Sequence, residues 1–361
     1  MSEAAGPERV ASYDRALWPE AIDTPERFDR ASRQEILSFA KVMQSTPLGD
    51  ASAISLFTGV KKPDIDSVHR WQEKTRQRLV SNYRAAGGVA NSWDDLQAAA
   101  LLPLEASANE RWQRVAEGFH LTYLYEQVRL AALFPAITSE ILPLDGLELT
   151  GAELPDRHFA LSFDDGPSLP GQTDKTLEVL RAQEVGAFFF VLGEKLEQRL
   201  ASSTAEQMRQ LYASQCLGSH GYRHASHQKL GSWRDSLEQT GQLIRQIAPG
   251  RQSVEPWFRP PYGQRSLELV GYLNERGGRL VLWNIDSQDW NGKMQPEAIR
   301  NRLMTLMLLW RSGIVLFHDI HPRARQVLPE LLGFVRAGGG EVEDCRDLIM
   351  RWAGERGSPL S

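Results

Sequence analysis

From about residue 141 the sequence alternates between short apolar runs and stretches with helical spacing. The apolar runs are Phe159–Phe163, Gly186–Leu192, Cys216–Ser219, Trp257–Phe258, Leu280–Ile285 and Gly313–Phe317. The helical stretches are Thr173–Gln183, Thr204–Ser214, Ser232–Ile247, Pro296–Arg311 and Gln326–Ala337. Strands that alternate with helices form a parallel sheet, either open or closed into a barrel. Because the chemistry of such barrels lies at the carboxyl ends of the strands, the residues that follow each run are candidate site residues.

The first 140 residues show a different pattern and predict an all-α region. Residues 1–28 are polar and interrupted by prolines, and we expect them to form an extended lead-in. Helices are predicted at about Arg27–Met43, Asp64–Ala85 and Asn109–Phe134, with a shorter one starting at Ser92. His69 and His120 stand alone on these helices, and we interpret them as structural residues. The expected organisation is a lead-in (1–28), a helical region (29–140) and an α/β domain (141–361).

Composition limits the classes of partner. The chain has 361 residues and a net charge of −5, so no global basic field is available to attract nucleic acid. No run of about 18 apolar residues is present, so no transmembrane segment is predicted. The first residues carry neither the basic nor the apolar part of a signal peptide. Cys216 and Cys345 fit no metal-binding spacing and are either one disulfide or two buried thiols.

The run Phe159–Phe163 delivers adjacent carboxylates, Asp164 and Asp165, to a turn closed by Gly166 and Pro167. Adjacent carboxylates repel each other in a buried pocket unless a cation or an arginine compensates them. This stretch therefore suggests a metal site or a division of catalytic roles, although a polar turn after a core strand fits it as well.

Two histidines follow another strand. His220 and His224 lie four positions apart, a spacing that places both on one side of a helical turn, close enough to bind one cation. Two imidazoles and one carboxylate suit Zn²⁺ with an open position for water. His227 does not share that side, and we expect it at the surface.

Three more strand ends carry polar residues. Arg259 precedes two prolines that stiffen its loop, and a fixed guanidinium can hold a carboxylate through two parallel hydrogen bonds. Asp286 and Asp289 follow the Leu280–Ile285 run and precede Trp290. His318 ends the Gly313–Phe317 run and is a candidate acid or base.

Together these stretches resemble the polysaccharide deacetylase family, also called the NodB-homology domain or carbohydrate esterase family four. The family's ordered motifs are T-F-D-D-G-P, H-[ST]-x-x-H, R-x-P-[YF]-G, D-x-x-D-W and L-x-H. Here they read Ser162-Phe-Asp-Asp-Gly-Pro167, His220-Gly-Tyr-Arg-His224, Arg259-Pro-Pro-Tyr-Gly263, Asp286-Ser-Gln-Asp-Trp290 and Leu316-Phe-His318. The resemblance covers about residues 155–350. Ser162 keeps the hydroxyl of the usual threonine, whereas Gly221 removes a hydroxyl that braces the loop.

The resemblance implies a distorted, TIM-like (β/α) barrel of the NodB-homology type, with the all-α region in front of it. It also implies a metal held by Asp165, His220 and His224. The expected metal is Zn²⁺, with Co²⁺ or Ni²⁺ as alternatives. Asp164 would be the general base that takes a proton from water, and Arg259 would orient it.

The remaining motif residues are expected to bind substrate or to complete the acid–base pair. The metal and the backbone N–H of Tyr262 would hold the oxyanion, next to Pro261. His318 would protonate the leaving amine, with Asp289 or Asp286 holding it protonated, and the family pattern favours Asp289. Trp290 and Leu316 would shape the acetyl pocket.

The implied reaction is the hydrolysis of N-acetyl groups on GlcNAc-type sugars of a cell-envelope or extracellular polysaccharide, with peptidoglycan favoured. An O-acetyl polysaccharide esterase is an alternative, and a non-catalytic glycan-binding protein is a less favoured one. An enzyme of this type would be periplasmic or secreted. The N-terminal helices are expected either to contact a partner or to extend the substrate cleft.

Overall fold

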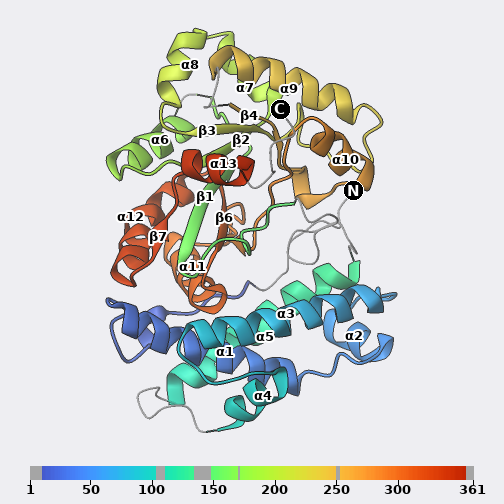
Figure 1. The fold of residues 1–361 in the computed structure, drawn as a ribbon, viewed down its shortest axis with the longest axis vertical. Coiled ribbons are helices and arrows are strands. Elements are labelled where there is room, and N and C mark those ends of the chain that lie inside the picture. Colours follow the sequence, from blue (N-terminus) through green and yellow to red (C-terminus); the bar gives the residue numbers. More distant parts are fainter. Residues whose placement is uncertain (1–9, 103–109, 134–147, 170, 249–252, 355–361) are drawn as a thin grey trace. The chain divides into compact units, whose positions relative to one another are not determined.

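The computed structural model describes residues 10–102, 110–133, 148–169, 171–248 and 253–354 (Figure 1). The chain divides into two compact units. Unit 1 comprises residues 1–142, 293–312 and 333–340, and unit 2 comprises residues 143–292, 313–332 and 341–361. The domain boundary predicted at residue 140 stays a prediction, because residues 134–147 lie outside the described part of the chain.

Unit 1 is helical, as predicted. Its helices are α1 (Pro25–Ser45), α2 (Ala51–Thr58), α3 (Ile65–Ala85), α4 (Trp93–Leu101), α5 (Glu110–Leu133) and α11 (Pro296–Trp310). Four of them begin at side-chain caps, for which the residues are Thr24, Asp50, Asp64 and Ser92. The lead-in is not wholly extended, because Asp14 caps a short 3-10 turn at Arg15–Leu17. Helix α2 was not predicted.

Buried polar contacts hold α11 to the other helices of unit 1. Arg302 on α11 donates hydrogen bonds to both carboxylate oxygens of Glu126 on α5, at 3.3 and 2.8 Å.

The two histidines that we predicted to be structural have partners within this unit. His120 is fully buried 2.8 Å from Glu35, and His69 contacts the Leu48 carbonyl at 3.2 Å.

Unit 2 contains a parallel sheet whose strands are β1 (His158–Asp164), β2 (Phe188–Val191), β3 (Cys216–Ser219), β4 (Ser253–Phe258), β5 (Ile285–Asp286), β6 (Gly313–His318) and β7 (Glu341–Val342). Their order is β4-β3-β2-β1-β6-β5, and β7 pairs with β1. The helices are α6 (Gln172–Ala182), α7 (Gly193–Leu200), α8 (Ala205–Leu211), α9 (Trp233–Ile247), α10 (Leu267–Glu275), α12 (Pro322–Ala337) and α13 (Cys345–Gly354). The end of α12, from residue 333 on, is grouped with unit 1. The elements α7, α10, α13 and β7 were not predicted.

The segment 280–286 closes this sheet on itself. At its start Leu280 bridges to Phe258 at the end of β4, and at its end β5 pairs with β6. Leu149 bridges to Val281 and adds a further parallel contact. The strands therefore form a distorted barrel, and the predicted fold class is confirmed. The predicted strand Leu280–Ile285 is shorter than expected, since only Ile285–Asp286 is a regular strand.

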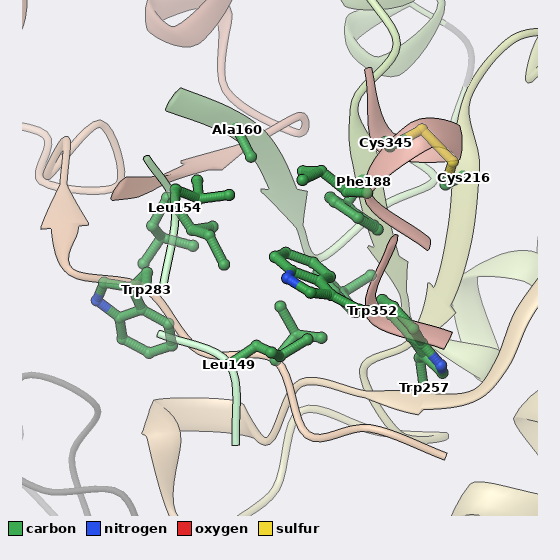
Figure 2. Close-up of a cluster of buried hydrophobic side chains, with 14 residues drawn as sticks. Leu149, Leu154, Ala160, Phe188, Cys216, Trp257, Trp283, Cys345 and Trp352 are labelled. Carbon is green, nitrogen blue, oxygen red and sulfur yellow. A yellow bond between two sulfur atoms is a disulfide. The ribbon is translucent and has the colours of Figure 1, made fainter. Parts of the chain in front are cut away.

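An aromatic cluster fills part of unit 2, and a disulfide lies at its edge. Figure 2 shows Trp257, Trp283 and Trp352 in this cluster, with the Cys216–Cys345 bond beside Phe188. The bond joins the start of β3 to the start of α13, across a sequence separation of 129. Of the two states left open by the sequence, the structure therefore has the disulfide.

Replacing Cys216 and Cys345 together with serine should destabilise unit 2. The crosslink closes a long loop and so restricts the unfolded chain, which is worth about 2–4 kcal/mol. Urea unfolding, followed by tryptophan fluorescence, should show a lower midpoint for the double variant than for the oxidised wild type. Reduced wild-type protein is the control, since its midpoint should approach that of the variant. Equal midpoints for oxidised and reduced protein would contradict the expectation.

Candidate functional site

The predicted site residues follow the carboxyl ends of the strands. Asp164 ends β1 and His318 ends β6, and these residues are directly opposite each other in the sheet. His220 follows β3, Arg259 follows β4, and Asp286 ends β5. Parallel strands bring their carboxyl ends to one side of a barrel, so distant segments of sequence meet there.

The turn after β1 separates the paired carboxylates. Asp165 has a φ of +75°, a left-handed conformation that non-glycine residues rarely adopt. Gly166 follows, and a Cβ on it would lie 2.2 Å from an oxygen of the buried Asp319 carboxylate, so only glycine fits. Asp164 is buried whereas Asp165 is partly exposed, and the adjacent acids therefore occupy different environments.

Asp165, His220 and His224 form a group that could hold a metal ion. One ligand atom from each residue lies within 4.8 Å of the others. Asp165 Oδ1 is 3.5 Å from His220 Nε2 and 3.6 Å from His224 Nε2. This Oδ1 atom is buried and has no hydrogen-bond partner among the described residues. A buried, unpaired carboxylate oxygen that faces two imidazole nitrogens fits a divalent cation.

Hydrogen bonds at the far side of each ring leave Nε2 available to this cation. His220 Nδ1 lies 2.7 Å from the Arg259 carbonyl, which can only accept, so Nδ1 carries the proton. His224 Nδ1 lies 3.1 Å from the Tyr262 hydroxyl. Such contacts fix the tautomer and the ring orientation of metal-binding histidines.

The loop that carries these histidines differs from the sequence prediction in two ways. His220 and His224 lie in a bent loop between β3 and α9 rather than on a helical turn. His227 is not at the surface, because it is 1% exposed and hydrogen-bonded to Ser236 at 2.9 Å. Spacing alone did not show that Gly221, with a φ of +86°, redirects this loop.

A second group with possible ligand atoms lies at the other end of the strands. It consists of His158, Glu341 and Glu343. Glu343 is already held by Arg351 Nη1 and Nη2, at 2.9 and 3.2 Å, and by His158 Nδ1 at 2.8 Å. The arginine supplies the compensating positive charge, so this group is an ion-pair network.

Arg259 is fully buried and holds Asp164. Its Nη1 donates to Asp164 Oδ1 at 2.9 Å and to the Ser162 hydroxyl at 2.8 Å. The other nitrogens donate to the carbonyls of Val281 and Leu282, at 3.1 and 2.8 Å. The contact with Asp164 is thus made by one nitrogen, not through the two parallel bonds that the sequence suggested. The hydroxyl of Ser162 was noted in the sequence, but the hydrogen bond that it accepts from Arg259 was not predicted.

Burial raises the pKa of Asp164 above the ordinary value, and the charge of Arg259 offsets this only in part. Asp164 Oδ2 lies 3.8 Å from His220 Nε2. A carboxylate with a raised pKa beside a candidate metal ligand can take a proton near neutral pH.

On the opposite strand end, Asp289 holds His318. Asp289 Oδ1 lies 2.8 Å from His318 Nδ1, and Oδ2 accepts the His318 backbone N–H at 2.9 Å. Burial favours the neutral ring, but the charge and hydrogen bond of Asp289 prevail and raise the pKa of His318 to about 10. Asp286 instead accepts the Gln288 N–H at 2.8 Å. Of the two acids, the structure therefore places Asp289 against His318.

The predicted substrate-binding residues differ in exposure. Tyr262 is 51% exposed and Trp290 is 37% exposed, so both rings are accessible to a ligand. Leu316 and Pro261 are buried. Sugars stack on exposed aromatic rings, so Tyr262 and Trp290 are the members of this group best placed to meet one.

Asp319 is a further acid that the sequence prediction did not single out. It follows His318, is fully buried, and lies against Gly166 in the turn after β1. Burial and the negative charge of Asp165 raise the pKa of Asp319 to about 7. The only feature of the sequence that could have pointed to Asp319 is its position next to His318.

Comparison with known proteins identifies the family. The sequence model of polysaccharide deacetylases matches residues 151–281. A chitooligosaccharide deacetylase of Azorhizobium caulinodans is 30% identical over 162 residues, which make up 44% of this chain and 72% of that enzyme. The chain belongs to the polysaccharide deacetylase family. The chain is also 30% identical over 150 residues to a peptidoglycan-N-acetylglucosamine deacetylase of Bacillus cereus. These residues make up 40% of the chain and 50% of that relative.

The chain spans about half the length of the Bacillus cereus relative and of a similar peptidoglycan-N-acetylglucosamine deacetylase, PgdA, of Listeria monocytogenes. Among solved structures, a peptidoglycan N-acetylglucosamine deacetylase bound to a substituted N-hydroxybenzamide is 22% identical, with a TM-score of 0.48. The match covers 55% of this chain and 91% of that one. The helices α1–α5 lie outside the residues matched by the family model.

Proposed function

We propose that this family member is a metal-dependent deacetylase that hydrolyses N-acetyl groups on GlcNAc-type sugars of a cell-envelope glycan, with peptidoglycan favoured. The observation that carries the proposal is the arrangement of Asp164 and Asp165. Asp165 faces His220 and His224, while its neighbour Asp164 is buried against Arg259. The Bacillus cereus relative, named for peptidoglycan N-acetylglucosamine, supports the choice of substrate.

Asp165, His220 and His224 would hold the metal. Their oxygen and nitrogen donors suit Zn²⁺, with Co²⁺ and Ni²⁺ as alternatives. Such a cation supplies a water of lowered pKa and polarises the acetyl carbonyl. The chain itself prepares the donors, because the Arg259 carbonyl and the Tyr262 hydroxyl orient the two rings.

In this proposal Asp164 accepts the proton of the attacking water. Arg259 holds one of its oxygens, at 2.9 Å, and thereby leaves the other to face the reacting groups. Because Arg259 is fixed by Ser162 and by backbone carbonyls, the carboxylate has little freedom to rotate. This fixed orientation places the base before substrate arrives.

His318 would deliver a proton to the leaving amine. Asp289 binds Nδ1, so the proton to be transferred is carried on Nε2. The backbone N–H of Tyr262 would bind the developing oxyanion, and Trp290 and Leu316 would shape the acetyl pocket. Pro261 and Asp286 would also contact the substrate. These roles follow the family motifs and remain part of the proposal.

The disulfide supports a periplasmic or secreted location. Disulfides persist in oxidising compartments and are rare in the cytosol, and Cys216 and Cys345 form one in the interior of unit 2. Within the described ranges, no helix combines the length and hydrophobicity needed to cross a membrane. A role of the N-terminal helices in partner binding or in extending the cleft stays a prediction.

Acetate release from chitooligosaccharides and from purified peptidoglycan tests the proposal. We expect release from one of them, its loss on adding a chelator, and its recovery when Zn²⁺ is restored. An acetylated xylan serves as the third substrate. Release from xylan alone would replace the proposal with an O-acetyl esterase. No release from any of the three, with metal bound stoichiometrically, would favour a glycan-binding protein.

A further inference from the structure

The loop between β3 and α9 lacks the hydroxyl that the family motif places after its first histidine. Gly221 occupies that position, in a left-handed conformation with a φ of +86°. Its N–H donates to Ser219 Oγ at 3.1 Å, and its carbonyl accepts the Gly193 N–H at 3.0 Å. Something else must therefore fix the part of the loop that holds His224.

A buried chain of hydrogen bonds supplies that support. The Tyr222 N–H donates to Ser236 Oγ at 2.8 Å, and this hydroxyl lies 2.9 Å from His227 Nε2. His227 Nδ1 lies 2.9 Å from the Ala225 carbonyl. Since a carbonyl only accepts, Nδ1 carries the proton and Nε2 accepts from the hydroxyl. We call these contacts among Tyr222, Ser236, His227 and Ala225 the His227 brace.

The brace ties down the backbone on both sides of His224. Tyr222 lies two residues before it and Ala225 one residue after it. The His224 side chain is 33% exposed, and its ring packs edge-on against Tyr262. His220, by contrast, is 3% exposed and bonded to the backbone of Arg259. His224 is thus the ligand whose position depends more on its own loop.

Gly221 and His227 share one small volume. A Cβ on Gly221 would lie 2.4 Å from His227 Cε1, 2.7 Å from Nε2 and 3.2 Å from Ser236 Oγ. The imidazole therefore occupies the space that a side chain at position 221 would need. It also packs on Phe258, with a centroid distance of 4.9 Å.

We propose that His227 and Ser236 are positioning residues for the metal centre, which hold His224 in place of the hydroxyl missing at Gly221. The inference rests on the proposed metal site of Asp165, His220 and His224. His227 itself is not a member of that ligand group, and it acts through the loop backbone.

Metal affinity and the spectrum of bound Co²⁺ test this role directly. In the full chain, His227→Ala and Ser236→Ala should each weaken Zn²⁺ binding about 10- to 100-fold in competition with a chromophoric chelator, as residues that orient metal ligands do. The visible absorption of bound Co²⁺, which reports ligand number and geometry, should change as His224 moves away. All proteins carry His158→Ala, so that the other His–Glu group does not contribute.

His69→Ala is the matched control, because it removes a histidine from unit 1 whose ring contacts the Leu48 carbonyl at 3.2 Å. It should leave affinity and spectrum unchanged. Thermal unfolding of the metal-free variants separates a local effect from general instability. If His227→Ala does not fold, Ser236→Ala decides, since it keeps the imidazole that fills the loop.

The shared volume gives a second, independent readout. Gly221→Ala should weaken Zn²⁺ binding at least 10-fold, through the close contact with His227 and the strained φ. Combining it with His227→Ala removes the contact, so the double variant should bind more tightly than the two single losses predict when added. Additive losses would show that the contact is irrelevant.

The outcomes distinguish this inference from the proposed function. If the parent protein binds no Zn²⁺ stoichiometrically, the proposed metal site fails and the brace has no role there. If the parent binds Zn²⁺ but both His227→Ala and Ser236→Ala bind it equally well with an unchanged Co²⁺ spectrum, the brace inference is overturned and the metal site stands.

Discussion

Replacing Asp164 with asparagine is expected to lower kcat for acetate release about 1,000-fold while one divalent metal ion stays bound per chain. Asparagine has nearly the same shape but cannot accept a proton, and general base catalysis is commonly worth 10²–10⁴-fold. Its amide oxygen can still accept from Arg259 Nη1, so the buried guanidinium keeps a partner. The metal ligands Asp165, His220 and His224 are untouched, so binding and catalysis should separate.

The measurement pairs initial rates at saturating substrate with metal content by atomic absorption. Asp235→Asn is the matched control, since it makes the same chemical change at an exposed position on α9. It should keep the wild-type rate. An Asp164→Asn protein that retains a tenth or more of the wild-type kcat would remove Asp164 from the role of base. A variant that loses both metal and rate would show that Asp164 is needed to hold the metal centre.

The site was more predictable than the packing around it, because its residues lie in short contiguous motifs. Asp164 and His318 each end a strand, and parallel strands carry their ends to one side whatever the details of the helices between them. The choice between Asp286 and Asp289 needed the structure. Asp286 ends β5 and Asp289 follows it, and only the structure shows that Asp289 lies against His318.

Features that depend on long-range packing could not be read from the sequence. The Cys216–Cys345 bond joins residues 129 positions apart, and spacing does not tell whether they meet. His227 was expected at the surface because its spacing excludes it from the side of His220 and His224. In the structure Gly221 is left-handed, and the ring of His227 is buried. A left-handed backbone conformation is defined by the φ angle in a structure, and the hydrophobic periodicity of a sequence does not reveal it.

Helix α11 is another element whose packing partners could not be predicted from the sequence. Its place between β5 and β6 in the sequence predicted a helix of the barrel, and the helix forms at Pro296–Trp310 as expected. The structure groups it with unit 1 instead, where Arg302 pairs with Glu126. The apolar residues of α11 are buried around much of its circumference, a pattern that a periodicity argument reads as helix without naming the neighbours.

Replacing Asp289 with asparagine should move the alkaline limb of the rate profile to lower pH and reduce kcat. In the wild type the Asp289 carboxylate holds the pKa of His318 at about 10, so the imidazolium persists, and activity should fall only as pH rises through about 10. Without that charge, burial favours the neutral ring, and the limb should move toward or below the ordinary histidine value of about 6.5.

The sign of the stability change follows from the same shift. A pKa raised on folding stabilises the protein fully below about pH 6.5, and this contribution is lost as pH rises through about 10. The difference in urea midpoint between the wild type and Asp289→Asn should therefore become smaller as pH rises between these two values. Asp286→Asn is the matched control, since it makes the same chemical change at the end of β5, and its alkaline limb should stay near that of the wild type. If Asp286→Asn moved the limb and Asp289→Asn did not, Asp286 would be the partner of the acid in the working enzyme. An unmoved limb in both variants would mean that the ionisation of His318 does not control the rate, and the proton for the leaving amine would have to come from another group.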